Sequence, residues 1–260
     1  MTNPLNQFML AFNAGLEKLL AARVPAYYGF RLLSGINVAP TATVRGVAIR
    51  CFIPITHVGV YEQFTHWETR EPETLDWLDG LSSTDVLLDV GAQIGQEALY
   101  AAKKPNGPRL IISFDADLLS AHVFANNIQL NELTERIHFY FTALADQTTS
   151  LEFSTPSGLY NLPQTLPHYP IHYRVGATTL DAICQAQHYH PTHLKMDVDG
   201  AEVAILRGSP QQLQTLQAAL IEVGPATRTP TIALLAAQGL KLCHEIPVGN
   251  AQNLFFERTP

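Results

Sequence analysis

The chain has 260 residues, enough to bury a sizeable hydrophobic core as one large domain or two small ones. Its 23 acidic and 16 basic residues give a formal net charge of −7 at pH 7. Because binding to phosphate backbones needs a basic surface, this charge argues against a general nucleic-acid-binding protein. The three cysteines are far apart and form no C-x-x-C pair, which favours free thiols in a reducing compartment.

The sequence gives no signal for export or membrane insertion. The N-terminus lacks the basic start of a signal peptide, and Glu17 and Lys18 interrupt its apolar stretch. The sequence has no run of about 18 or more apolar residues that could span a bilayer. We therefore expect a cytoplasmic protein.

Residues 1–69 are predicted to form an N-terminal helical and β-hairpin cap or extension, ahead of the main domain at residues 70–260. Apolar side chains recur at helical spacing in residues 4–22, which predicts a helix that covers the core or a partner subunit. A membrane-surface helix is the less favoured alternative, because the polar face is not rich in Lys and Arg. A homodimer through this N-terminal region is therefore one expectation. Residues 44–55 predict a strand or hairpin, and the aromatic and histidine-rich residues 57–67 predict either a lid or a packed loop.

A short helix is predicted at residues 71–80. Pro72 suits the first turn of a helix, and Gly80 is a natural place for the helix to end. Glu71 and Glu73 have a structural explanation, because negative charge favours a helix N-terminus. A cofactor role for these two glutamates is an equally open alternative.

The most informative stretch is residues 86–100, V-L-L-D-V-G-A-Q-I-G-Q-E-A-L-Y. It predicts a buried strand that ends in a turn between Gly91 and Gly95 and then opens a helix, as nucleotide sites of parallel sheets do. The G-x-x-x-G spacing lacks the glycine that brings a pyrophosphate against the loop, and Asp89 would repel a phosphate. A cationic ligand without phosphates, such as S-adenosylmethionine (SAM), fits this turn better. A strand–turn–helix unit without a ligand is the structural alternative.

Two further strands are predicted to contribute to the same site. The strand at residues 110–114 is followed by Asp115, in the place where an acid of such folds meets ribose hydroxyls. The strand at residues 138–141 leads into Ala143 and Leu144, within a run of small residues. Small side chains there leave room for a flat ring such as adenine.

A long surface insertion is predicted at about residues 153–175, which are rich in proline, tyrosine and histidine. Long loops without secondary structure of their own are usually functional or disordered, and the aromatic residues favour order. We therefore expect substrate contacts in this insertion. T-T-L-D at residues 178–181 then predicts the capped start of a helix.

The second informative stretch is K-M-D-V-D-G-A-E at residues 195–202. It places Asp197, Asp199 and Glu202 at the C-terminal end of a strand, where open α/β sheets bind ligands. Crowded carboxylates raise one another's pKa, and Lys195 opposes that shift. Such a group could take a proton from an alcohol, stabilise a sulfonium charge or ligate Mg²⁺. In the structural alternative, Lys195 pairs with an acid and Glu202 faces solvent.

The remaining elements complete an α/β sheet. A strand at residues 219–223 contains Glu222, and a helix follows at residues 231–238. Residues 241–246 and 253–257 predict an antiparallel hairpin that closes the sheet.

Six motifs along the chain occur in the order of a known family. D-V-G-A-Q-I-G at residues 89–95 resembles D-V-G-A-N-I-G, and residues 195–202 are similar to K-I-D-V-E-G-A-E. These are signatures of the FkbM-family SAM-dependent methyltransferases. The shorter matches are E-P-E at residues 71–73, F-D-A-D at 114–117, T-A-L-A-D at 142–146 and T-T-L-D at 178–181.

The resemblance implies a Rossmann-like class I methyltransferase fold, with a seven-stranded, mostly parallel sheet, helices on both faces and an antiparallel strand near the C-terminus. It also implies SAM as the methyl donor and a hydroxyl as the usual acceptor. Asp115 stands where the family has glutamate, so this shorter side chain must sit nearer the ribose or reach it through water. The residues that the resemblance places around the cofactor are Asp89, Gly91, Ala92, Gln93, Gly95, Asp115, Ala116, Ala143, Leu144 and Asp197.

The resemblance therefore implies O-methylation of a hydroxyl on a sugar, glycolipid or natural product. Asp197 or Asp199 is the expected catalytic base, with His168 or His172 of the insertion in reserve. The spacing does not demand Mg²⁺; if Mg²⁺ takes part, the expected ligands are Asp197, Asp199 and Glu222. A NAD-dependent oxidoreductase and a non-catalytic SAM-binding protein are the alternatives.

Overall fold

The computed structural model describes most of the chain, namely residues 39–52, 63–155 and 171–259. Residues 39–260 form one compact unit. The helix predicted at residues 4–22 lies outside the described residues, so the predicted cap and its dimer contact stay predictions. The helices that the structure describes are all too short or too polar to span a lipid bilayer.

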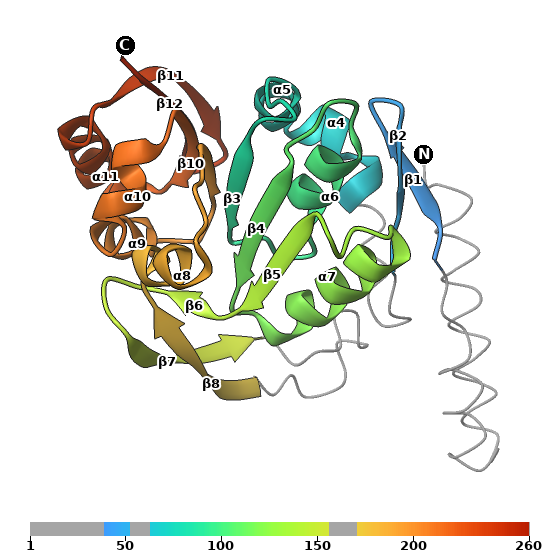
Figure 1. Cartoon of the computed structure of the whole chain (residues 1–260), viewed down its shortest axis with the longest axis horizontal. Coiled ribbons are helices and arrows are strands. Elements are labelled where there is room, and N and C mark those ends of the chain that lie inside the picture. The colour runs from blue at the N-terminus through green and yellow to red at the C-terminus, as the bar shows by residue number, and fades with distance from the viewer. Residues whose placement is uncertain (1–38, 53–62, 156–170, 260) are drawn as a thin grey trace. The chain divides into compact units, whose positions relative to one another are not determined.

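A seven-stranded sheet runs through the centre of this unit (Figure 1). β12 runs antiparallel to both of its neighbours, and the other neighbouring strands are parallel. This confirms the predicted mostly parallel sheet and its closing antiparallel hairpin. In spatial order the strands are β11 (Leu240–Val248), β12 (Ala251–Arg258), β10 (Ala218–Val223), β9 (His193–Met196), β3 (Val86–Val90), β4 (Leu110–Asp115) and β5 (Ile137–Phe141).

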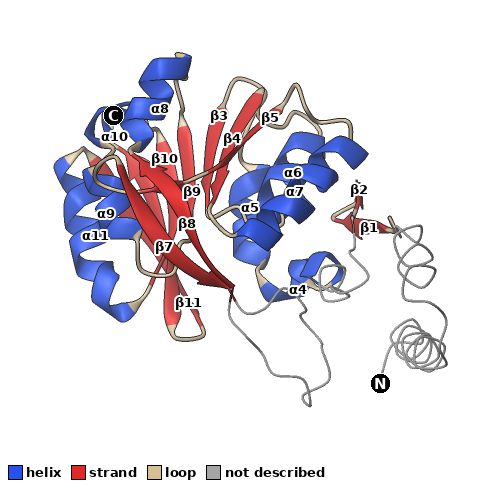
Figure 2. Ribbon diagram, turned by 90° about the horizontal axis from the view of Figure 1, so that it is seen from below, coloured by secondary structure: helices blue, strands red, loops and turns tan. Residues whose placement is uncertain are grey.

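Helices cover both faces of the sheet, as predicted (Figure 2). Every residue of β3 is buried, because a parallel strand between two helical layers has apolar neighbours on both sides. Leu87 packs into the core beneath the first helical layer, and Leu88 packs into the core beneath the second. The first layer holds α4 (Trp67–Arg70), α5 (Pro72–Asp79), α6 (Gln96–Lys103) and α7 (Leu118–Leu130), and the second holds α8 (Leu180–Gln187), α9 (Glu202–Arg207), α10 (Pro210–Thr215) and α11 (Pro225–Ala237).

The helix boundaries predicted from capping residues are confirmed for α5 and α8. Pro72 is the first residue of α5, where its missing N–H costs no helical hydrogen bond, and the helix ends at Gly80. Thr179 caps α8, because its hydroxyl accepts a hydrogen bond from the amide of Ala182 at 3.1 Å.

A two-stranded hairpin of β1 (Thr41–Val44) and β2 (Val47–Arg50) packs against α6. The sequence placed a strand or hairpin at residues 44–55, so the hairpin begins earlier than predicted. Asn127 of α7 accepts a hydrogen bond from the amide of Phe52 at 2.6 Å and donates one to the carbonyl of Ile94 at 2.9 Å. The segment that leaves β2 is thereby fastened to the turn before α6.

A second, three-stranded sheet was not predicted. It contains β6 (Ala143–Leu144), β8 (Ile171–Thr178) and β7 (Thr149–Thr155), in that spatial order. Both ends of the region predicted as an insertion are therefore paired strands, while residues 156–170 lie outside the described residues. The rings of Phe153 and Tyr173 stack at 5.9 Å, which shows why the aromatic residues of this region favour a sheet.

The C-terminal half contains more helix than predicted. α9 and α10 were not predicted, and α11 begins at Pro225 rather than near residue 231. Pro225 is the first residue of α11, where a proline is tolerated, and Pro230 lies within the helix, so Pro230 did not mark a boundary. Arg258, at the end of β12, donates hydrogen bonds to the carbonyls of Leu213, Leu216 and Gln238 at 2.6, 2.6 and 2.9 Å.

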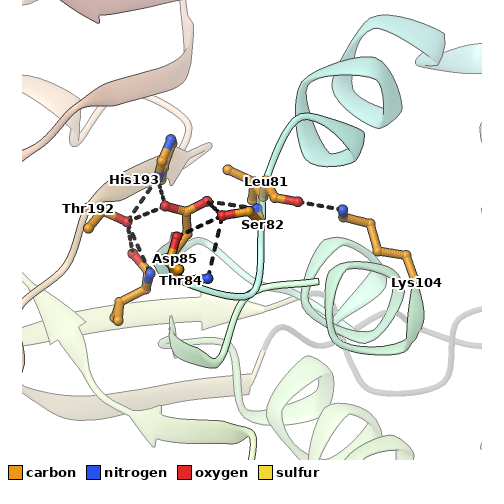
Figure 3. A network of polar contacts seen from close by, with 8 residues as sticks. Leu81, Ser82, Thr84, Asp85, Lys104, Thr192 and His193 are labelled. Carbon is orange, nitrogen blue, oxygen red and sulfur yellow. Dashed lines mark hydrogen bonds and ion pairs between the residues drawn. The ribbon is translucent and has the colours of Figure 1, made fainter. Parts of the chain in front are cut away.

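Polar side chains join the loop before β3 to the start of β9 (Figure 3). The amide and hydroxyl of Ser82 donate to one carboxylate oxygen of Asp85 at 2.7 and 2.8 Å. The Thr192 hydroxyl lies 3.4 Å from the other oxygen, and His193 Nδ1 lies 3.6 Å from it. Burial acts to raise the pKa of Asp85, but the Ser82 hydrogen bonds and nearby His193 outweigh it, so this pKa lies below its ordinary value. Burial lowers the pKa of His193, and Asp85 opposes that effect.

Replacing Asp85 with asparagine is expected to lower the free energy of unfolding by about 1–3 kcal/mol at pH 7. The side-chain NH₂ of the asparagine must then face either the two Ser82 donors or the Thr192 hydroxyl, and it cannot accept a hydrogen bond from them. The folded-state pKa of Asp85 lies below its unfolded value of about 3.9, so its contribution is complete above that pH and is lost as pH falls through the folded pKa. The lowered pKa of His193 also makes the folded state less stable as pH falls below about 6.5. Urea unfolding at pH 7 measures the effect of Asp85→Asn, and wild-type unfolding at pH 7, 5 and 3 follows the loss from His193 and then the loss from Asp85. Asp146→Asn, at an exposed aspartate, is the matched control, and an unchanged urea midpoint for Asp85→Asn would contradict the prediction.

Candidate active site

The glycine turn lies at the C-terminal end of β3. The amides of Gly91 and Ala92 both donate to the carbonyl of Phe114, at 2.9 and 3.0 Å, which ties the turn to the end of β4. Gly91 has a φ of +78°, and a Cβ built on it would lie 1.7 Å from the carbonyl oxygen of Asp197. A glycine is therefore required where β3 and the segment after β9 approach each other.

The second glycine of the turn is required by packing. Gly95 has a φ of +86°, and an added Cβ would lie 2.0 Å from the ring of Phe124 in α7. Gln93 also has a positive φ, of 45°, and its backbone amide donates to a carboxylate oxygen of Asp115 at 2.6 Å. The turn is thus held by α7 on one side and by Asp115 on the other.

Asp115 holds two backbone segments together at the end of β4. One of its oxygens accepts from Gln93, and the other accepts from the amide of Asp117 at 2.7 Å. Burial raises the pKa of Asp115, and these two hydrogen bonds oppose the shift. Because an ionised carboxylate has about four lone-pair sites, it can still accept hydrogen bonds from a ligand.

The residues predicted around adenine lie near one another but are largely covered. Ala143 is buried in a small apolar cluster against which Ala116 packs. Leu144 is buried in the core beneath the second helical layer. Tyr173 of β8 donates to the carbonyl of Ala116 at 3.0 Å and accepts from the amide of Leu118 at 3.1 Å. The second sheet therefore borders the loop that follows Asp115.

A buried group of charges lies beneath the turn. Asp89 is fully buried on β3 and pairs in register with Lys195 on the neighbouring strand β9. Its Oδ2 accepts from Ser113 at 3.4 Å, while Oδ1 has no hydrogen-bond partner among the described residues. Burial raises the pKa of Asp89 to about 7, although the positive charge of Lys195 opposes the shift.

Lys195 forms an ion pair with Glu97 of α6, with Nζ 3.5 Å from Oε1. Burial alone would lower the pKa of Lys195, but Glu97, Asp197 and Asp89 outweigh burial and raise it. Burial also raises the pKa of Glu97. The alternative in which Lys195 pairs with an acid is thus confirmed. Its second part is wrong, because Glu202 is buried and accepts a hydrogen bond from the amide of Gly200 at 2.7 Å.

A pocket of about 230 Å³ opens beside this charge group. Of the residues predicted for the site, Gly91, Gln93 and Asp197 line it. The other predicted residues, Asp89, Ala92, Gly95, Asp115, Ala116, Ala143, Leu144 and Asp199, are not in its lining. Among the residues that the structure describes, the lining is Gln63, Arg70, Glu71, Gly91, Gln93, Gln96, Glu97, Lys195 and Asp197.

Four residues of the pocket, Gln63, Arg70, Gln96 and Glu97, were not predicted for the site. Glu97 is a polar residue at the start of the helix that follows the predicted ligand-binding turn, and this position could have indicated a residue of the site, although not its pairing with Lys195. Gln96 donates to the backbone carbonyl of Gln63 at 3.1 Å, which brings the segment before α4 to the pocket.

The predicted catalytic carboxylates differ in their surroundings. Asp197 is half-buried, and its amide donates to the carbonyl of Val90 at 2.9 Å. Asp199 is exposed and has a φ of +49°. His172 is exposed on β8, and His168 lies outside the described residues. Among the residues that the structure describes, no group of three or more His, Cys, Asp or Glu is placed to hold a metal ion.

Comparisons with known proteins find solved structures that are similar to this chain, including the following three. The FkbM methyltransferase from Methylobacillus flagellatus KT is 17% identical with a TM-score of 0.45, and the match covers 77% of this chain and 54% of that one. TrmK of M. capricolum in complex with S-adenosyl-homocysteine is 9% identical with a TM-score of 0.47, covering 72% and 68%. TYW2 of M. jannaschii in complex with AdoMet is 12% identical with a TM-score of 0.46, covering 86% and 88%. A comparison with curated protein sequences gives no match.

The family itself is shown by a match to a family model. Residues 89–235 match the methyltransferase FkbM domain, and this range begins at Asp89 and includes the glycine turn, Asp115 and Asp197. The match covers more than half of the sequence and confirms the resemblance found in the motifs. The chain belongs to the FkbM methyltransferase domain family.

Proposed function

We propose that the protein is a SAM-dependent methyltransferase that methylates a hydroxyl on a sugar, a glycolipid or another natural product. The observation that carries this proposal is the pocket at the C-terminal end of β3, whose lining contains both acids and cations. The methionine end of SAM carries an ammonium, a carboxylate and a sulfonium. Glu71, Glu97 and Asp197 suit the positive groups, and Arg70 and Lys195 suit the carboxylate.

The acceptor groups around the turn fit the same ligand. The pocket contains part of the turn but not Asp115, so we assign the methionine end to the pocket and the ribose to Asp115. Oδ1 of Asp89 is a buried acceptor without a hydrogen-bond partner among the described residues, which suits a cationic ligand nearby. The rest of the proposed cofactor contacts are Gly91, Ala92, Gln93 and Gly95 at the turn and Ala116, Ala143 and Leu144 at the adenine.

The acids of the pocket also favour SAM over a dinucleotide. Glu71, Glu97 and Asp197 line the space beside the turn, where a pyrophosphate would be repelled. The turn has glycine at Gly91 and Gly95 but not between them, so its backbone lacks the close approach that a pyrophosphate needs. Calorimetric titration with SAM and with NAD separates the two cofactors, and binding of NAD alone would overturn the proposal.

SAM, when bound, supplies an electrophilic methyl group, and the chain supplies alignment and charge. Methyl transfer is an in-line displacement, so holding the two reactants in line accounts for much of the rate. Asp197 is the predicted catalytic carboxylate that lines the pocket, and we place the acceptor hydroxyl near it. Asp199 is the other predicted catalytic carboxylate, and its exposure leaves it free to contact an acceptor at the mouth of the site.

Replacing Asp197 with asparagine is expected to lower turnover roughly 10²-fold or more while SAM still binds, because the change removes a charge beside the acceptor and keeps the shape. The measurement is transfer of labelled methyl from SAM to a cell extract, followed by identification of the labelled product. Asp199→Asn in parallel compares the two carboxylates, and Asp146→Asn is the control for loss of an exposed aspartate. Full activity of Asp197→Asn would remove Asp197 from the mechanism.

A cytoplasmic location, a homodimer through the N-terminal region and a small-molecule or glycan acceptor belong to the same proposal. The cysteine usage supports the location, the apolar spacing of residues 4–22 supports the dimer, and the family resemblance supports the acceptor class. Sedimentation of the full chain tests the dimer, and the labelled product identifies the acceptor.

A further inference from the structure

A row of polar side chains extends from the pocket across the C-terminal edge of the sheet. Met196 of β9 pairs in register with Ile221 of β10, so the next residues, Asp197 and Glu222, lie side by side at the C-terminal edge of the sheet. Glu222 pairs in turn with Asn253 of β12. Three neighbouring strands therefore present an aspartate, a glutamate and an asparagine at one edge.

The side chains of Glu222 and Asn253 face the pocket side of the sheet. Ile221 and Val223 pack into the core beneath the second helical layer, so Glu222, which lies between them, points to the opposite face. Asn253 confirms this direction, because its amide donates to Glu73 at the start of α5 at 3.2 Å. The residue before α5 is Glu71, which lines the pocket.

We propose that Glu222 is the general base that accepts the proton of the acceptor hydroxyl, and that the acceptor lies over the ends of β9 and β10 between Asp197 and Asn253. This inference rests on the proposed methyltransferase function. In the step, the hydroxyl oxygen forms a bond to the methyl carbon, and the carbon–sulfur bond breaks with its electron pair left on sulfur. The hydroxyl proton moves to the Glu222 carboxylate, which later returns it to water.

The charges around Glu222 suit this role. Burial raises the pKa of Glu222 to about 7, and the negative charge of Asp197 adds to the shift while Lys195 opposes it. Glu71 and Asp199 also raise this pKa, and Asn253 with Glu73 completes the polar surroundings on the β12 and α5 side. A base whose pKa lies near the working pH combines ionisation with affinity for a proton.

Glu222 and Asp89 have similar pKa values, but they differ in where they lie. Asp89 also has a pKa of about 7, but it is fully buried beneath the glycine turn. Glu222 is half-buried at the edge of the sheet, where an acceptor can reach it. The hydrogen-bonding groups beside it are carboxylates and one amide, which match an acceptor that carries several hydroxyls.

The test combines a titration with a transfer assay on the full chain. In protein labelled with ¹³C at the glutamate carboxyls, the signal lost in Glu222→Gln belongs to Glu222, and we expect it to titrate near pH 7. In transfer of labelled methyl from SAM to the cell extract, Glu222→Gln should lose roughly 10²-fold in rate or more, with SAM affinity unchanged. Glu222→Asp should keep part of the activity with a shifted pH profile. The control is Glu257→Gln, which removes an exposed glutamate from the other end of the β10–β12 ladder.

The outcomes separate this inference from the proposed function. Failure of the wild type to bind SAM would overturn the proposed function, whatever Glu222 does. SAM binding with a Glu222 signal that titrates in the ordinary range of glutamate would overturn the inference alone. The inference alone would also be overturned if Glu222→Gln transfers methyl at the wild-type rate and with the wild-type pH profile.

Discussion

Gly91→Ala is expected to abolish SAM binding and to destabilise the fold by about 3 kcal/mol or more, from a strained left-handed residue and an overpacked contact. The added Cβ would stand 1.7 Å from the carbonyl oxygen of Asp197, and Gly91 has a φ of +78°. Because the clash is with backbone, no side-chain rotation relieves it. The end of β3 must move away from the segment after β9, and the turn and Asp197 would be displaced together.

The measurement for Gly91→Ala is urea unfolding together with calorimetric titration with SAM. Gly224→Ala is the matched control, because Gly224 has a negative φ of −78° and its added Cβ meets nothing within 4 Å. Lowered stability together with loss of SAM binding would support the geometry of the turn. A Gly91→Ala protein with wild-type stability and SAM affinity would show that the turn does not form as described.

Lys195→Met is expected to cost about 3–5 kcal/mol of stability at pH 8, because removing one partner of a buried ion pair leaves an uncompensated charge. Lys195 pairs with Glu97, and both side chains are buried. Asp89 and Asp197 also lie close enough to affect the pKa of Lys195. Without the lysine these acids keep their burial cost and lose the attraction that offsets it.

The effect of Lys195→Met should depend on pH in a defined direction. The folded-state pKa values of Asp89 and Glu97 already lie above their ordinary values, and the loss of Lys195 would raise them further. An acid with a raised folded pKa stabilises the fold below its unfolded pKa and loses that contribution as pH rises through the folded pKa. Lys195→Met should therefore be less destabilised at pH 5 than at pH 8.

A double variant separates the ion pair from general damage to the core. Lys195→Met with Glu97→Gln removes both charges of the pair, so part of the lost stability should return at pH 8. Urea unfolding of the wild type, both single variants and the double variant gives the coupling free energy. Additive losses that do not depend on pH would show that Lys195 contributes only by packing.

The main sheet was predictable because its signals are local. The apolar run of β3 with the turn at Gly91 and the caps of α5 and α8 each depend on residues within a few positions of one another. The second sheet was not predictable in this way. Its strands β7 and β8 pair across residues 156–170, and prolines in that region favoured a loop.

The residues of the candidate site also differ in how far they could be predicted from local signals. Gly91 and Gln93 lie within one motif, and Asp197 lies within another, and all three line the pocket. Glu97 was missed because its importance comes from its ion pair with Lys195, which is distant in the sequence but lies 3.5 Å away in the fold. Pairings between distant segments carry no local signal, so they could not be predicted from single motifs.

The position of β12 has a consequence for the synthesis of the protein. β12 lies between β10 and β11, although both of those strands precede it in the chain. A nascent chain emerging from the ribosome therefore holds two unpaired strand edges until the last strand of the sheet arrives, and such edges invite intermolecular pairing. Translational pausing or premature termination ahead of residue 251 would leave a species prone to aggregation, and Arg258 would secure the sheet only after the strand has inserted.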